Sequence, residues 1–158
     1  MEGSARERGE SPEQVLDRNV DELLQETRVA TAGVQFLFAF LLTLPFTQRF
    51  GELTDFHEDL YTVTLLSTAC AAVVLIAPVS YHRVLFRQRE KQAVVTFADR
   101  ALLTGLVLLL VGISSAVLLV LDVVLGRGPA VAGCAAVTAL AVVVWFALPG
   151  WRRVRSDD

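Results

Sequence analysis

The sequence predicts an all-α, polytopic membrane protein with four transmembrane helices arranged as two hairpins and preceded by a cytoplasmic amphipathic helix. Hydrophobic residues make up 54% of the 158 residues, against roughly 45–50% in an ordinary soluble domain. The excess lies in four blocks without a charged residue, at 29–46, 60–80, 101–121 and 129–148. Each block approaches the ~20 residues that a helix needs to cross ~30 Å of hydrocarbon. We therefore interpret the blocks as membrane spans.

The residues before the first block divide into a tail and a helix. Residues 1–11 are polar and without periodicity, so we expect a disordered tail. From Pro12 to Arg28, apolar residues recur at the helical period while the other face is mostly acidic. Anionic lipid would repel such a face. Two interpretations stay open: docking on a protein surface, such as the basic central segment or a second subunit, or a cytosolic extension of the first span.

The first predicted span, 29–46, carries one strongly polar residue, Gln35, about a third of the way across. At that depth a glutamine usually bonds a neighbouring helix or a backbone carbonyl. The alternative is a polar contact in a conduction path. Arg28 stands where its side chain can reach the interface, and Pro45 is expected to end the helix.

The predicted outer loops are short. We expect residues 47–59 to form a solvated acidic loop, and residues 126–129 to form a tight turn after Asp122, which ends the third span. The first loop contains a small group of metal-binding residue types, but their spacing matches no ligand pattern, and we expect no metal or cofactor. The members of this group are Asp55, His57, Glu58 and Asp59.

Small residues mark the third span. Gly105 and Gly112 are seven residues apart and share one helix face, where another helix can approach closely. Cys70 and Cys134 both fall inside spans, and we expect them to behave as small hydrophobic residues rather than as a disulfide.

The distribution of Lys and Arg predicts the topology. Of 14 basic residues, 12 lie before the first span, in the central segment 81–100 or after the fourth span. Since cytoplasmic segments are enriched in Lys and Arg, both termini and the central segment are expected inside and the two short loops outside. The hairpins would then close into a four-helix bundle. His82, at the membrane edge beside Arg83, is interpreted as a polar anchor.

Several segments together carry a resemblance to a known family. They are ELLQETR at 22–28, GVQFLFAFLLTLPF at 33–46, Arg49-Phe50, Ala77-Pro78-Val79, His82-Arg83 and Phe86-Arg87. These segments resemble a family of small, four-span actinobacterial membrane proteins catalogued as a domain of unknown function. The resemblance covers about residues 15–125 and is strongest across the first two spans. It implies a bacterial inner (plasma) membrane protein and supplies no functional residues; members sometimes carry the label sodium:proton antiporter.

Two functions remain open from the sequence. The absence of charge within the spans, the short outer loops and the apolar third and fourth spans favour a non-catalytic accessory or scaffold protein. An antiporter needs carboxylates that bind protons or sodium inside the membrane. Here Glu26 and Asp122 lie only at span borders, so an antiporter would have to be an oligomer with Glu26, Gln35 and Asp122 at its interfaces.

The sequence contains no motif that indicates an enzyme or a nucleic-acid-binding protein. We expect no enzyme, because no nucleophile–base pair, HExxH motif or phosphate loop occurs. Nucleic-acid binding is not expected, because topology accounts for the basic central segment. The expected partners are the lipid bilayer and a second copy or another membrane protein. The candidate polar, interface or ion-path residues are Glu26, Arg28, Gln35, Arg49, His82, Arg83 and Asp122.

Overall fold

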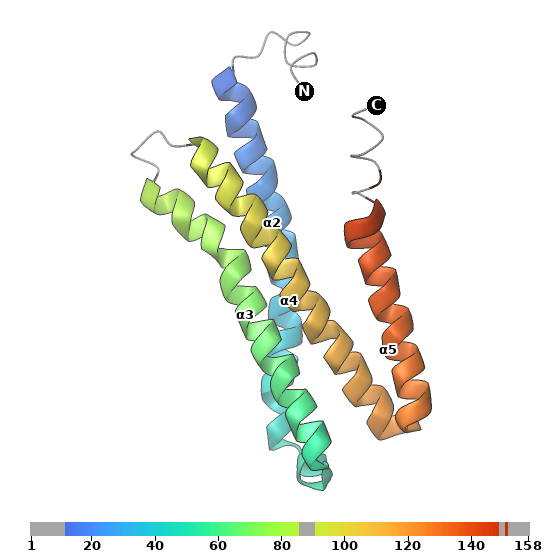
Figure 1. Ribbon diagram of the computed structural model, residues 1–158. Coiled ribbons are helices and arrows are strands. Elements are labelled where there is room, and N and C mark those ends of the chain that lie inside the picture. Colours follow the sequence, from blue (N-terminus) through green and yellow to red (C-terminus); the bar gives the residue numbers. More distant parts are fainter. Residues whose placement is uncertain (1–11, 86–90, 149–150, 152–158) are drawn as a thin grey trace. The chain divides into compact units, whose positions relative to one another are not determined.

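The computed structural model describes residues 12–85, 91–148 and 151, and this part of the chain is helical with short turns (Figure 1). The predicted tail 1–11, the middle of the central segment at 86–90, and residues 149–150 and 152–158 at the C-terminal end lie outside the described residues. The long helices are α2 (Pro12–Thr43), α3 (Asp55–Leu85), α4 (Lys91–Leu125) and α5 (Arg127–Val142). The short elements are the 3₁₀ helices η1 (Leu44–Phe46) and η2 (Gln48–Glu52) and the π-helical η3 (Val143–Ala147).

Three helical segments are long and apolar enough to cross a membrane: Asp55–Tyr81, Thr96–Leu125 and Arg127–Ala147. A fourth apolar segment, Thr31–Phe46, is shorter. The predicted all-α class with four apolar helices is therefore confirmed. The segment Thr31–Phe46 is shorter because charged residues continue up to Arg28 on its N-terminal side, and Pro45 follows the end of α2 on its C-terminal side.

The helices extend beyond the apolar blocks. The amphipathic helix and the first apolar segment form one continuous helix, α2, of 32 residues. The acidic loop predicted at 47–59 was too long, because α3 already begins at Asp55. Asp55 and Glu58 occupy its first turn, where a negative charge favours helix formation. Much of the predicted central loop is likewise helical, as the end of α3 and the start of α4.

The chain divides into two compact units, each containing parts of several helices. The first comprises Met1–Phe40 and Ala69–Val107. In its core, Leu75 is fully buried, and a Cβ added at Gly105 would lie 2.5 Å from Leu75 Cδ2. Nearer the other end of α3, Tyr81 and Phe97 stack with their ring centroids 4.4 Å apart. These contacts pack α3 against α4.

The second unit comprises Leu41–Thr68 and Leu108–Asp158. Thr64 and Thr68 are fully buried, and their hydroxyls donate to the carbonyls of Leu60 and Thr64 at 2.7 and 2.6 Å. A Cβ at Gly112 would lie 2.8 Å from Thr68 Oγ1. Gly105 and Gly112 thus each meet α3, which confirms the predicted close approach of another helix on their face.

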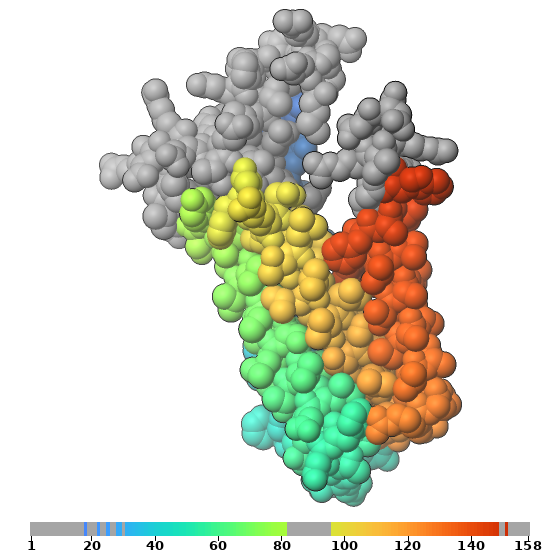
Figure 2. All heavy atoms as spheres, viewed as in Figure 1, coloured from blue at the N-terminus to red at the C-terminus, as the bar shows by residue number. Residues whose placement is uncertain are grey.

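Within the second unit, α5 returns along α4 after a single non-helical residue, Gly126, whose φ is +82°. Ser114 and Thr138 share a hydrogen bond of 2.7 Å, and Cys134 Sγ donates to the Ser114 carbonyl at 3.3 Å. Only 6% of the most apolar window of Arg127–Ala147, which comprises α5 and η3, is buried, and the face of this segment that Figure 2 shows is uncovered. The contact with the Ser114 carbonyl makes Cys134 a hydrogen-bond donor as well as the small hydrophobic residue expected from the sequence.

Candidate functional site

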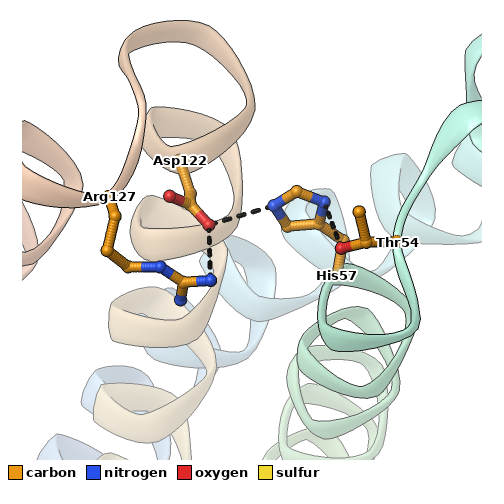
Figure 3. A network of polar contacts seen from close by, with 4 residues as sticks. All are labelled: Thr54, His57, Asp122 and Arg127. Carbon is orange, nitrogen blue, oxygen red and sulfur yellow. Dashed lines mark hydrogen bonds and ion pairs between the residues drawn. The ribbon is translucent and has the colours of Figure 1, made fainter.

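Four polar side chains from three helix ends meet in the second unit (Figure 3). Thr54 and His57 stand at the start of α3, Asp122 lies in the last turn of α4, and Arg127 opens α5. The chain reverses at Gly126, and this turn brings Arg127 back toward Asp122. We call these four residues the polar cluster.

The Asp122 carboxylate is the centre of the polar cluster. Its Oδ2 lies 3.0 Å from His57 Nε2 and 3.3 Å from Arg127 Nη2. The Asp122 side chain is 6% exposed and that of His57 15%, whereas Arg127 is 57% exposed. On the far side of the ring, His57 Nδ1 lies 3.0 Å from Thr54 Oγ1. A neutral imidazole that donates from Nε2 to Asp122 therefore accepts from the Thr54 hydroxyl at Nδ1.

The Phe56 ring contacts the Arg127 guanidinium, which also lies beside Asp122. The Arg127 guanidinium carbon lies 3.9 Å from the centroid of the Phe56 ring. A guanidinium over an aromatic face gains from the ring quadrupole. Arg127 therefore stays beside Asp122 although half of its own surface is open to solvent.

The cluster is a chain of polar contacts centred on one carboxylate. The Asp122 carboxylate has a permanent cation, Arg127, and the His57 imidazole as neighbours, and Thr54 orients the imidazole from its other side. Among the described residues, no group of three His, Cys, Asp or Glu side chains lies close enough to hold a metal ion.

A largely apolar groove of about 160 Å³ lies at the same end of these helices, also within the second unit. Its only charged lining residue is Arg49. One wall is fixed by Tyr61, whose hydroxyl donates to the Leu41 carbonyl at 2.9 Å and whose ring meets Phe50 edge-on at 5.0 Å. The lining residues are Leu44, Thr47, Arg49, Phe50, Leu53, Tyr61, Leu119, Val120, Val123 and Val124.

Of the residues singled out from the sequence, Asp122 lies in the polar cluster and Arg49 lines the groove. Arg28 and Gln35 are exposed on α2. Among the residues that the structure describes, Gln35 has no hydrogen-bond partner, and the contact expected for it with a neighbouring helix or a backbone carbonyl stays a prediction. The backbones of the remaining three residues lie in helices, but their side chains lie outside the described part. They are Glu26, His82 and Arg83.

The sequence interpretation missed His57 and Arg127 as parts of a site. His57 was considered only with its acidic neighbours, and Arg127 only as a residue of the outer turn. A signal was available, because the predicted topology places the start of the second span and the end of the third on one side. A carboxylate at such a boundary is stable when a cation is near, and these two are the nearest candidates by topology.

Comparison with known proteins gives a family and no function. No curated protein and no solved structure matches the chain. Residues 9–149 match the family of unknown function DUF6328. The match includes all four long helices, the polar cluster and the groove. The chain therefore belongs to the DUF6328 family.

Proposed function

We propose that the protein is a non-catalytic accessory or scaffold component of the bacterial inner membrane, which binds a second copy of itself or another membrane protein. The observation that carries the proposal is Gln35. This residue is exposed within the apolar segment Thr31–Phe46, and it has no hydrogen-bond partner among the described residues.

A glutamine amide in this position has unmet hydrogen-bonding capacity. Its side chain has two N–H donors and an acceptor oxygen. Hydrocarbon offers these groups no partner, and leaving them unpaired is costly. A polar group on a neighbouring transmembrane helix removes the cost, which is why glutamine promotes helix association in membranes.

Within the first unit, one side of α2 is open for such a contact. Arg28 and Gln35 are seven residues apart on this helix, and both are exposed. Val34, the residue before Gln35, is fully buried. The side of α2 that carries Val34 packs into the unit, and the side that carries Gln35 is left for a partner.

The distribution of basic residues supports the orientation in this proposal. Twelve of the 14 Lys and Arg residues lie in the N-terminal region, the central segment or the C-terminal tail. By the preference of basic residues for the cytoplasmic side, both termini are cytoplasmic, and the polar cluster and the groove lie near the outer surface.

Association in membranes tests the proposal. Two full-length copies with different tags are expressed together, cross-linked in the membrane and captured through one tag. We expect the second copy or a discrete membrane protein to be captured, and Gln35→Leu to reduce the yield several-fold. Gln48→Leu makes the same change at an exposed position of η2 and should have no effect. Capture that Gln35→Leu leaves unchanged, or no capture of any partner, would overturn the proposal.

The second candidate function is sodium:proton antiport by a small oligomer. The observation in its favour is the largely buried Asp122 carboxylate, 3.0 Å from His57, because antiport needs a carboxylate at which the two cations compete. Against it, the spans contain no carboxylate away from their ends. Purified protein in liposomes with an internal pH-sensitive dye decides the matter.

If the antiport proposal holds, a sodium gradient moves protons, and Asp122→Asn abolishes the movement. Asp99→Asn, the same change at an exposed position of α4, leaves it intact. Folded protein that moves no more protons than empty liposomes would exclude antiport and leave the accessory function standing.

A further inference from the structure

We propose that the groove binds one anionic phospholipid, with part of an acyl chain along its apolar walls and the phosphate against Arg49. The groove is built entirely from the second unit, and neither candidate function described above requires it.

The walls of the groove suit a hydrocarbon chain. Nearly all of the lining side chains are apolar or aromatic, and the hydroxyl of Tyr61 is already used by the Leu41 carbonyl. The volume of about 160 Å³ is close to that of an engineered cavity of ~150 Å³ that binds benzene. A cavity of this size accepts a section of one chain. Val120 and Val124, which are 54% and 68% exposed, leave the groove open along α4 for the rest of the lipid.

The positive charge of Arg49 favours an anionic ligand in the groove. It is exposed, and among the described residues it forms no ion pair. A guanidinium presents a planar fork of N–H donors that matches two phosphate oxygens. No carboxylate lines the groove, so the charge of Arg49 is not compensated there, and an anionic amphiphile fits better than a zwitterionic or neutral one.

The position of the groove along the helices matches the level of a lipid headgroup. Leu44 lies at the end of the apolar segment Thr31–Phe46, residues 47–53 follow directly on it, and residues 119–124 form the last turns of the apolar segment Thr96–Leu125. The apolar part of a span ends where hydrocarbon meets headgroups. A basic residue beside an apolar groove at this level therefore meets a phosphate and an acyl chain of the same molecule.

Native mass spectrometry of the full-length protein in mild detergent tests the charge preference. The protein is titrated with phosphatidylglycerol or with phosphatidylcholine of the same acyl chains. We expect tighter retention of one phosphatidylglycerol, and Arg49→Gln should weaken it about fivefold, the effect of one basic residue at a lipid surface. Arg100→Gln makes the same change at an exposed position of α4 outside the groove and should have no effect.

A second pair of variants tests whether the apolar walls of the groove hold the acyl chain, and leaves Arg49 unchanged. Val123→Trp fills the groove and should lower phosphatidylglycerol retention, whereas Val73→Trp, at a 71% exposed position of α3 outside the groove, should not. Circular dichroism checks that each variant keeps its helices, and Val123→Asn replaces Val123→Trp if the larger residue disrupts folding. Equal retention of the two lipids, or a preference that survives both Arg49→Gln and the Val123 variant, would overturn the proposal.

Discussion

His57 Nε2 lies 3.0 Å from Asp122 Oδ2, and this contact joins residues that are 65 positions apart. It connects the first turn of α3 to the last turn of α4. Both side chains are largely buried, so the contact is shielded from solvent more than a surface ion pair is. Arg127 adds a second, more exposed partner to the same carboxylate oxygen.

Asp122→Asn should lower the free energy of unfolding by about 1–3 kcal/mol, since it weakens a partly buried hydrogen bond and removes the charge opposite Arg127. Unfolding in mixed detergents followed by circular dichroism measures the loss. Asp99→Asn is the control, because Asp99 is exposed on the same helix and should change stability by less than about 0.5 kcal/mol. Equal losses in the two variants would mean that the polar cluster does not stabilise the protein.

Gly112→Ala should destabilise the contact of α4 with α3. The added methyl would lie 2.8 Å from Thr68 Oγ1, and Thr68 cannot turn away without losing its 2.6 Å bond to the Thr64 carbonyl. We expect a loss of about 1–3 kcal/mol, typical of overpacking. Gly33→Ala places the same methyl on α2 with nothing within 4 Å and should be neutral or slightly stabilising. A stable Gly112→Ala protein would show that the two helices are farther apart than described.

Gly126→Ala should also be costly, for a reason that lies in the backbone. The φ of Gly126 is +82°, a conformation that a residue with a Cβ rarely adopts, although no atom would meet the methyl within 4 Å. The expected loss is about 1–2 kcal/mol. Gly51→Ala is the matched control, because Gly51 has equally open surroundings and no positive φ. The same mixed-detergent unfolding compares the two, and a loss confined to Gly126→Ala supports the turn geometry.

Ser114 and Thr138 should be energetically coupled. Their 2.7 Å hydrogen bond links α4 to α5 inside the apolar part of both helices. A double-mutant cycle with Ser114→Ala and Thr138→Val should give a coupling of about 0.6 kcal/mol, the average found for such bonds in a membrane protein. Additive effects of the two substitutions would show that the bond contributes nothing to holding α5.

The proposed orientation can be measured with cysteine labelling in whole cells. In a protein with Cys70 and Cys134 replaced by serine, a membrane-impermeant maleimide should label Gly51→Cys, because residue 51 lies in the turn predicted to face outward. Ser156→Cys in the C-terminal tail should be labelled only after the cells are permeabilised. The opposite pattern would reverse the topology.

The sequence predicted the helices well because the cause lies within each segment. Charge-free blocks of about 20 residues have few alternatives to membrane helices. Helical periodicity also placed Gly105 and Gly112 on one face, and that face does meet α3. The helix ends were less predictable, since helices continue past their apolar part wherever the backbone is favourable, as α3 does at Asp55.

The polar cluster could not be predicted in the same way. Periodicity determines which face of its own helix Asp122 occupies, but the register between two helices decides that His57 is its partner. That register depends on how α3 and α4 pack within the second unit, including the contact of Thr68 with Gly112. The sequence likewise indicates that Gln35 needs a polar partner but not which helix supplies it, and the residue is exposed on α2.

The one-residue connection at Gly126 has a consequence for biogenesis and for divergence within the family. Because one residue joins α4 to α5, a membrane location would require the two helices to insert together as one hairpin. Inserting or deleting a residue there would rotate α5 by about 100° about its axis. Thr138 would then turn away from Ser114, and Arg127 from Asp122. We therefore expect the one-residue length of this connection to be kept among relatives.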